Sequence, residues 1–414
     1  MRKSILLKGP LLTRSGYGEQ TRFALRALRS RPDLFNIFIQ PLQWGQTSWV
    51  NDVSDERTWI DQTIEKTIAH IQQGGQFDAS LQVTIPNEFE KIARFNIGYT
   101  AGIETTKVAP QWLQNSNEIV DKLIVVSRHS KNIFENTVYR AVNEQTKEEF
   151  DYRLSVPIDV VNYPTKNYSK LPNIDLDLEY DFNFLIVSQY GPRKNIANTI
   201  KWFMSEFKDE EVGLVVKTNM AKNSHIDFIN TEVKLHKIMQ DVPELKDRKC
   251  KVYLLHGDMT DEEVHSLYSH PKIKAFVSLA HGEGFGLPLF EAAYTGIPVV
   301  SVGWSGHLDF LIDDSNKSQF YNVAFDINNV QEEAVWEGII QPDSKWAYAR
   351  ENSAKEQMRL CYEDVTNNNI DYVQTHAEFL RDKFNEDDLH KQFVDSIISV
   401  VGEAEPQEAQ VFVL

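Results

Sequence analysis

Cysteine is scarce in this sequence and long apolar runs are absent. The 414 residues contain only two cysteines, Cys250 and Cys361, which excludes a disulfide framework and a zinc site made of several cysteines. No stretch approaches the roughly 20 apolar residues that cross a bilayer, and the apolar start of the chain is too short for a signal peptide. We therefore expect a cytoplasmic protein without integral membrane contact.

Basic residues are outnumbered by acidic ones, and they are unevenly placed. The chain has 43 Lys and Arg against 60 Asp and Glu, a net charge of −17, which argues against tight nonspecific binding to nucleic acid. Residues 1–50, however, hold eight basic and two acidic side chains. The N-terminal part therefore presents a different electrostatic field from the remainder.

Short β-branched runs alternate with helical patterns along nearly the whole chain, which is typical of parallel α/β domains. The predicted strands of the first half are 5–8, 35–40, 80–84, 95–99, 122–126 and 159–162. Those of the second half are 183–188, 212–217, 252–256, 275–279 and 298–302. Proline, asparagine and acidic residues interrupt the pattern between them, as in a linker. We predict an N-terminal domain 1–165, a linker 166–181, a second domain 182–384, a final helix 385–402 and a tail 403–414.

The most informative stretch is residues 280–293, with the sequence AHGEGFGLPLFEAA. Its glycines allow a sharp turn and the close approach of a ligand, and the start of the helix that follows favours a phosphate or diphosphate. Glu283 and Glu291 flank the turn eight positions apart, and their carboxylates can accept hydrogen bonds from ribose or sugar hydroxyls. The alternative is a plain glycine-rich turn with solvated glutamates, since glycine strings alone are weak evidence.

This pair of glutamates resembles the E-x7-E element of the retaining GT-B glycosyltransferases of group 1, also called family four. Further stretches resemble signatures of that family: 98–106 (GYTAGIETT), 125–130 (VVSRHS), 160–164 (VVNYP), 276–281 (FVSLAH) and 296–300 (GIPVV). The resemblance implies an α/β protein with two Rossmann-like domains facing across a cleft and a C-terminal helix that crosses back. It also implies transfer of a sugar from a UDP- or GDP-linked donor to an acceptor hydroxyl, with retention of configuration and without a metal or covalent nucleophile.

The resemblance gives donor-binding roles mainly to the second domain. Glu291 would hold the ribose hydroxyls and Glu283 would face the transferred sugar, which makes Glu283 a catalytic candidate. Lys194 matches the family's phosphate lysine, whereas Gln189 stands where the usual arginine would be, so one expected charge is missing. The other donor-binding candidates are Arg193, Lys217, Phe285, Gly286, Leu287, Gly257, Met259 and, from the first domain, Gly16.

Acceptor-side candidates lie in the first domain. Glu104 follows the predicted strand 95–99, at the edge where open α/β sheets bind ligands, and the resemblance implies that it contacts the acceptor hydroxyl, which makes it the second catalytic candidate. The alternative is a solvated loop glutamate. Asn87 follows another strand and is a weaker candidate of the same kind. The first interpretation is that these residues contact an acceptor sugar.

A second acceptor interpretation comes from the basic residues near the N-terminus. Arg22, Arg26 and Arg29 share one face of the predicted first helix, and Arg14 lies close by. A solvated basic face is the simplest interpretation. The alternative is a phosphate-bearing acceptor, including DNA, because phage enzymes that glycosylate hydroxylated DNA bases share the GT-B architecture.

Other function classes stay open. A nucleotide-sugar epimerase or a binding-only protein on the same scaffold would carry the same nucleotide site. Residues 175–177 match the Asp-x-Asp metal motif as a string but fall in the predicted linker, so we expect no metal. The stretch 303–307 (GWSGH) is a near miss for the hydrolase elbow G-x-S-x-G, because its fifth residue is histidine.

Overall fold

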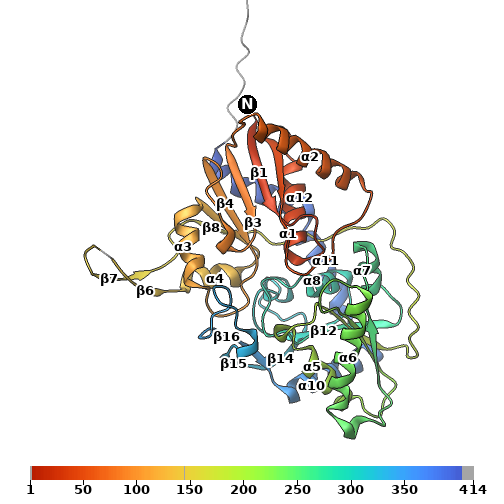
Figure 1. Cartoon of the computed structure of the whole chain (residues 1–414). Helices are drawn as coiled ribbons and strands as arrows, with labels where there is room; N and C mark the ends of the chain where they lie inside the picture. The colour runs from red at the N-terminus through yellow and green to blue at the C-terminus, as the bar shows by residue number, and fades with distance from the viewer. Residues whose placement is uncertain (1, 144, 403–414) are drawn as a thin grey trace, which may run out of the picture.

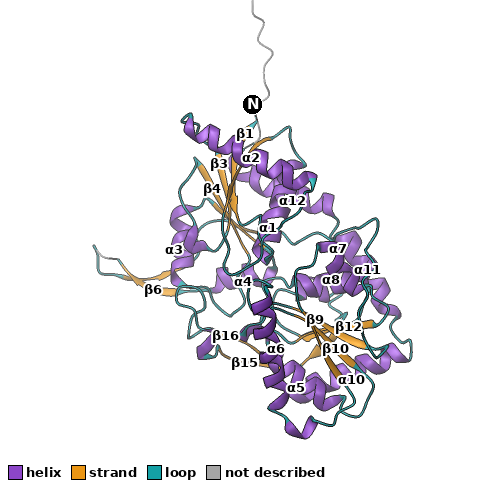
Figure 2. Cartoon of the chain, turned by 45° about the vertical axis from the view of Figure 1, so that its right-hand side comes forward, coloured by secondary structure: helices purple, strands orange, loops and turns teal. Residues whose placement is uncertain are grey.

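The computed structural model describes residues 2–143 and 145–402, so the predicted tail 403–414 lies outside the described residues. The chain forms two α/β units, one above the other in Figure 1, each built on a six-stranded sheet. The strand orders are β2-β1-β3-β4-β5-β8 and β11-β10-β9-β12-β13-β14. All neighbouring strands in both sheets pair in parallel, and helices flank each sheet (Figure 2).

The first unit begins with an apolar strand and a capped helix. Its sheet strands are β1 (Lys3–Gly9), β2 (Phe35–Pro41), β3 (Ala79–Val83), β4 (Phe95–Thr100), β5 (Lys122–Val125) and β8 (Ile158–Val160). Its helices are α1 (Gly16–Arg29), α2 (Asp55–Gln72), α3 (Pro110–Ile119) and α4 (Arg128–Asn136). The Ser15 hydroxyl accepts a hydrogen bond from the N–H of Gly18 at 2.9 Å, which fixes the start of α1.

The second unit repeats this arrangement with more helices. Its strands are β9 (Asn183–Val187), β10 (Gly213–Lys217), β11 (Lys251–Leu255), β12 (Ile273–Ser278), β13 (Val299–Val302), β14 (Tyr321–Val323), β15 (Phe325–Asn329) and β16 (Lys345–Ala349). Its helices are α5 (Ile196–Glu206), α6 (His225–Gln240), α7 (Asp261–Tyr268), α8 (Leu287–Thr295), α9 (Leu308–Leu311), α10 (Glu351–Thr366) and α11 (Asp371–Lys383). Strands β15 and β16 form a separate antiparallel pair.

An antiparallel hairpin in the first unit, made of β6 (Tyr139–Val142) and β7 (Glu149–Tyr152), was not expected from the sequence. It projects from the body of the molecule in Figure 1. Its strands are short and mostly exposed, so their sequence lacks the apolar pattern that marks the buried parallel strands.

The last helix returns to the first unit. Helix α12 (Glu386–Val401) packs against α1 and β4, and the ring of Phe393 contacts those of Phe23 and Tyr99 at centroid distances of 5.3 and 5.0 Å. Between β8 and β9 the chain runs without helix or strand, in the region of the predicted linker. None of the helices within residues 2–143 and 145–402 is both long and apolar enough to cross a bilayer.

Candidate active site

The glycine-rich turn between β12 and α8 lies at the seam between the two units. Gly286 precedes α8 at φ 95°, a left-handed backbone that favours glycine, and Pro288 lies in the first turn of the helix. Among the described residues, none accepts a hydrogen bond from the N–H of Phe285, Gly286 or Leu287. The helix start therefore keeps its donors available for an anion. The Phe285 side chain itself is buried, against Tyr163 among other rings.

Two glycines of this turn admit the backbone of the first unit. A Cβ at Gly284 would lie 1.9 Å from the carbonyl oxygen of Ala101, and one at Gly282 would lie 2.2 Å from that of Glu104. The Ser127 hydroxyl donates to the Gly284 carbonyl at 2.6 Å. The glycines that the sequence suggested for close approach to a ligand thus also permit close approach of the two domains.

Four charged side chains meet beside this turn. Glu283 accepts from Lys194 Nζ at 2.5 Å and from Arg193 Nη1 at 2.9 Å. Arg193 Nη2 pairs with Glu104 of the first unit at 2.9 Å. We call Glu104, Arg193, Lys194 and Glu283 the seam cluster. The structure therefore brings both predicted catalytic glutamates to one arginine.

Burial and charge act in opposite directions within the seam cluster. Burial raises the pKa of Glu283, but Lys194 and Arg193 outweigh it and lower that pKa to about 2. Burial also raises the pKa of Glu104. The charge of Arg193 lowers that pKa but does not outweigh burial, so the pKa of Glu104 is raised overall. Glu283 is consequently a firm anion, whereas Glu104 is the carboxylate of the two that is easier to protonate.

A serine that sequence reasoning did not select positions Glu283. Ser305 adopts φ 92°, a conformation that costs energy in a residue with a side chain. Its hydroxyl accepts a hydrogen bond from the N–H of Glu283 at 2.9 Å. In the sequence, Ser305 drew attention only as part of the stretch 303–307, which nearly matches the hydrolase elbow. In the structure, this serine instead holds the glycine-rich turn in place.

Glu291 faces a separate cavity of about 240 Å³ between α1, α7, α8 and the linker. Tyr268 donates its O–H to the Glu291 carboxylate at 3.0 Å. Burial raises the pKa of Glu291, against the opposing charges of His265 and Lys166. Lys166 lines the same cavity and was missed because it lies in the predicted linker. The two glutamates of the E-x7-E element therefore have different surroundings.

The loops that follow β10 and β11 hold the remaining donor-side candidates. Lys217 Nζ donates to the Gly257 carbonyl at 2.6 Å. Arg14, from the first unit, donates through Nη1 to the Met259 carbonyl at 2.6 Å. Gln189 donates to the carbonyl of Met220. Arg14, named above on the acceptor side, thus lies against the donor-side loop.

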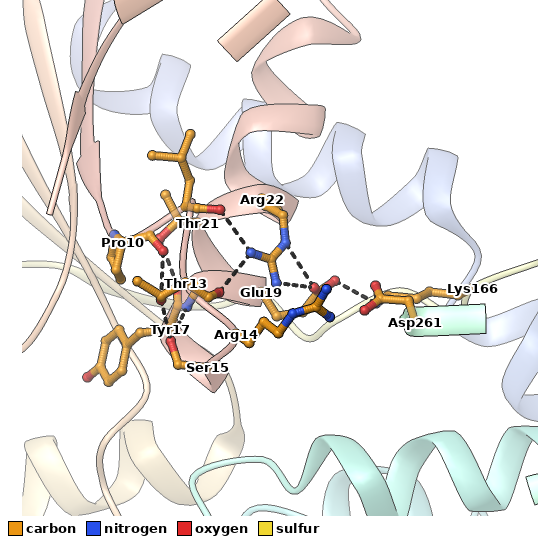
Figure 3. A network of polar contacts seen from close by, with 12 residues as sticks. Pro10, Thr13, Arg14, Ser15, Tyr17, Glu19, Thr21, Arg22, Lys166 and Asp261 are labelled. Carbon is orange, nitrogen blue, oxygen red and sulfur yellow. Dashed lines mark hydrogen bonds and ion pairs between the residues drawn. The ribbon is translucent and has the colours of Figure 1, made fainter. Parts of the chain in front are cut away.

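The basic face expected on α1 is not free. Arg22 pairs with Glu19 at 3.0 Å, and Arg26 pairs with Glu56 at 2.9 Å. Glu19 also pairs with Lys166 of the linker at 2.8 Å, and Figure 3 shows Arg22 beside Glu19 at the start of α1. The expectation of a free basic surface is therefore wrong for Arg22 and Arg26, which carboxylates three and 30 positions away neutralise. The Arg29 guanidinium instead lies over the ring of Trp59 at 4.4 Å.

The other candidates are dispersed. Gly16 is exposed at the start of α1 with open space around it, and Asn87 donates to the carbonyl of Gly338 in the second unit at 3.1 Å. Asp175 and Asp177 are exposed in the linker region. Across the described residues, no group of three or more His, Cys, Asp or Glu side chains is arranged to hold a metal ion.

Comparisons with known proteins agree with this architecture. Residues 178–332 match the family described as "Glycosyl transferases group 1". No curated protein sequence matches the chain.

Solved structures match nearly the full length at low identity. Sucrose-phosphate synthase from Thermosynechococcus elongatus superposes with a TM-score of 0.59 at 13% identity, covering 96% of this chain and 99% of that one. A glycosyltransferase from Rickettsia africae gives 0.57 at 12%, covering 97% and 100%. Anabaena HepE, solved with UDP and glucose, gives 0.55 at 12%, covering 96% and 100%.

These matches bear on the fold prediction directly. They confirm two Rossmann-like domains with a GT-B arrangement, including the helices at the C-terminus. The family match covers the glycine-rich turn and both of its glutamates. Residues 178–332 thus match the group 1 glycosyltransferases, and the chain as a whole has the GT-B fold.

Proposed function

We propose that this protein transfers a sugar from a nucleotide-diphosphate sugar to a hydroxyl of a carbohydrate acceptor, with retention of anomeric configuration. The seam cluster is the observation that carries the proposal. It puts two carboxylates and two cations next to the donor N–H groups of α8, at the junction of the domains. Departure of a nucleoside diphosphate needs preorganised hydrogen-bond donors, and the free N–H groups at the start of α8 supply them beside the cluster.

On the donor side, the diphosphate binds at the start of α8 with Lys194, and the nucleoside end extends toward Glu291. The free N–H groups of the turn support this placement. The position of Glu291 in a cavity, held by Tyr268, supports a role in binding ribose hydroxyls. The UDP bound to HepE makes UDP the first nucleotide to test.

On the acceptor side, Glu104 contacts the hydroxyl that is glycosylated, and Glu283 faces the transferred sugar. The upward shift in the pKa of Glu104 supports its use in proton transfer. No observation favours DNA as the acceptor, because Arg22 and Arg26 are occupied by carboxylates. We propose no metal in the reaction.

The experiment is release of nucleoside diphosphate from a panel of UDP- and GDP-sugars, with and without sugar acceptors. Acceptor-dependent release supports transfer, whereas binding or epimerisation without release supports one of the alternative classes. The anomeric configuration of the product, read by NMR, tests retention. Glu291→Ala should weaken donor binding at least tenfold, since the ribose hydroxyls lose a charged acceptor, and unchanged binding in calorimetry would contradict the assignment.

A further inference from the structure

The donor side of the cleft has a gap in its positive charge. Gln189 occupies the place of an expected phosphate arginine, and its amide donates to a backbone carbonyl. Arg193 is paired with Glu104 and Glu283, and Lys194 is paired with Glu283, so carboxylates already balance the charge of both cations in that loop. A nucleotide with two phosphate groups needs another cation from elsewhere in the structure.

Arg14 comes from the opposite domain and has unused donor capacity. It lies in the loop between β1 and α1, beside Ser15 in Figure 3. Its Nη1 reaches the Met259 carbonyl at 2.6 Å, whereas its Nε is buried without a hydrogen-bond partner among the described residues. A guanidinium has five N–H donors in a planar fork suited to phosphate, so the single carbonyl leaves most of them unused.

Lys217 is a second cation at the same loop. It is the last residue of β10, is only 9% exposed, and donates to the Gly257 carbonyl at 2.6 Å. Burial lowers the pKa of Lys217, and the charge of Arg14 lowers it further against the pull of Asp258. Arg14 and Lys217 donate to carbonyls only two positions apart in the same loop, those of Met259 and Gly257.

Neither cation has a carboxylate partner within the described part of the chain. Asp258, the carboxylate whose charge acts on Lys217, accepts a hydrogen bond from the Asn223 amide at 2.8 Å. Both cations are therefore satisfied by neutral carbonyl oxygens alone, and a phosphate oxygen is the stronger acceptor for each. Two like charges held together at an interface are stabilised when an anion lies between them.

We propose that Arg14 and Lys217 form a two-domain clamp for the phosphate groups of the nucleotide donor. Lys217 contributes from the donor domain and Arg14 from the facing domain. Donor binding thereby joins the two domains directly, and Arg14 supplies the charge that Gln189 lacks. This inference rests on the proposed function, because it specifies how the same donor site binds diphosphate.

The test compares Arg14→Gln, Lys217→Gln and a control by calorimetry with UDP, GDP, uridine and guanosine. The control is Ser48→Ala, because Ser48 donates to the Lys222 carbonyl at 2.9 Å and so bridges the same two domains without charge. The diphosphate that the wild type binds more tightly, UDP or GDP, should bind each glutamine variant at least tenfold more weakly. Binding of the nucleoside with the same base should change less than twofold. Ser48→Ala should bind the diphosphate within twofold of the wild type. Thermal unfolding of each variant establishes that it is folded.

Three outcomes would overturn the clamp while leaving the proposed function intact. They are unchanged diphosphate binding by Arg14→Gln, equal loss of diphosphate and nucleoside binding, and a loss in Ser48→Ala as large as in Arg14→Gln. The last outcome would mean that domain contact alone accounts for the effect. Failure of the wild-type protein to bind UDP or GDP would instead overturn the proposed function, and the clamp with it.

Discussion

Replacing Gly284 by alanine should hold the two domains apart. The added Cβ would lie 1.9 Å from the Ala101 carbonyl oxygen, and real Cβ contacts essentially never fall below 3.0 Å. The backbone fixes the position of the Cβ, and the carbonyl oxygen is itself a backbone atom, so no side chain can rotate away to relieve the clash. The domains must therefore separate locally by at least about 1.1 Å.

A separation of this size is enough to break the hydrogen bonds between the two domains at this point. Applied to the bond between Ser127 and the Gly284 carbonyl, it would lengthen 2.6 Å to about 3.7 Å, beyond hydrogen-bonding range. The neighbouring ion pair of Arg193 with Glu104, now 2.9 Å, would weaken in the same way. Overpacking of this kind costs about 1–3 kcal/mol. The closed arrangement should consequently become about five- to 150-fold less favourable relative to an open one.

Small-angle scattering is the measurement, because opening of two domains increases the radius of gyration. Sugar transfer should fall along with closure, whereas donor binding by the second domain should be less affected. Gly191→Ala is the matched control: Gly191 has an extended backbone at φ −177° and open space around its Cβ position. A Gly284→Ala protein with the scattering curve and transfer rate of the wild type would refute the reasoning.

Two further predictions concern the glutamates. The pKa of Glu283 is lowered from 4.5 to about 2, so its ionised form stabilises the fold fully above pH 4.5 and loses this contribution as pH falls toward 2. Urea unfolding of wild type and Glu283→Gln should differ by at most about 3 kcal/mol at pH 6, and by less at pH 3; a larger difference at pH 3 would contradict the ion pairing. Tyr268→Phe removes the hydrogen bond to Glu291 and should weaken UDP binding about tenfold in calorimetry. Tyr180→Phe, whose hydroxyl donates to the Lys249 carbonyl, should bind like wild type, and equal affinities of all three proteins would remove Glu291 from the donor site.

Local sequence was sufficient for the elements that are periodic and buried. Strands such as β1, with Ile5 and Leu7 fully buried, have an apolar pattern that fits few structures other than a buried strand. The β6–β7 hairpin carries none, because its short strands are largely exposed, and it was missed. The positions of the domain boundaries at 165 and 384 remain predictions.

The candidate site was partly predictable for the same reason. Glu283, Lys194, Arg193 and Glu104 were selected from motif position, and the structure brings them within hydrogen-bonding distance of one another. Ser305 was not selected, since its role depends on a backbone N–H that lies 22 positions away along the chain. A contact of this kind has no local signature.

The sequence by itself determined the two parallel sheets, because they follow from the periodicity of apolar residues. It also determined the glycine-rich turn and the types of charged side chain near it, because these follow from the spacing of a few residues. Only the tertiary structure decided which charges are free. It neutralised Arg26 with Glu56 of another helix, and it left Arg14 facing the opposite domain with carbonyl oxygen as its acceptor. Electrostatic pairing depends on distance through space, and distance through space is fixed only when both domains have folded and met.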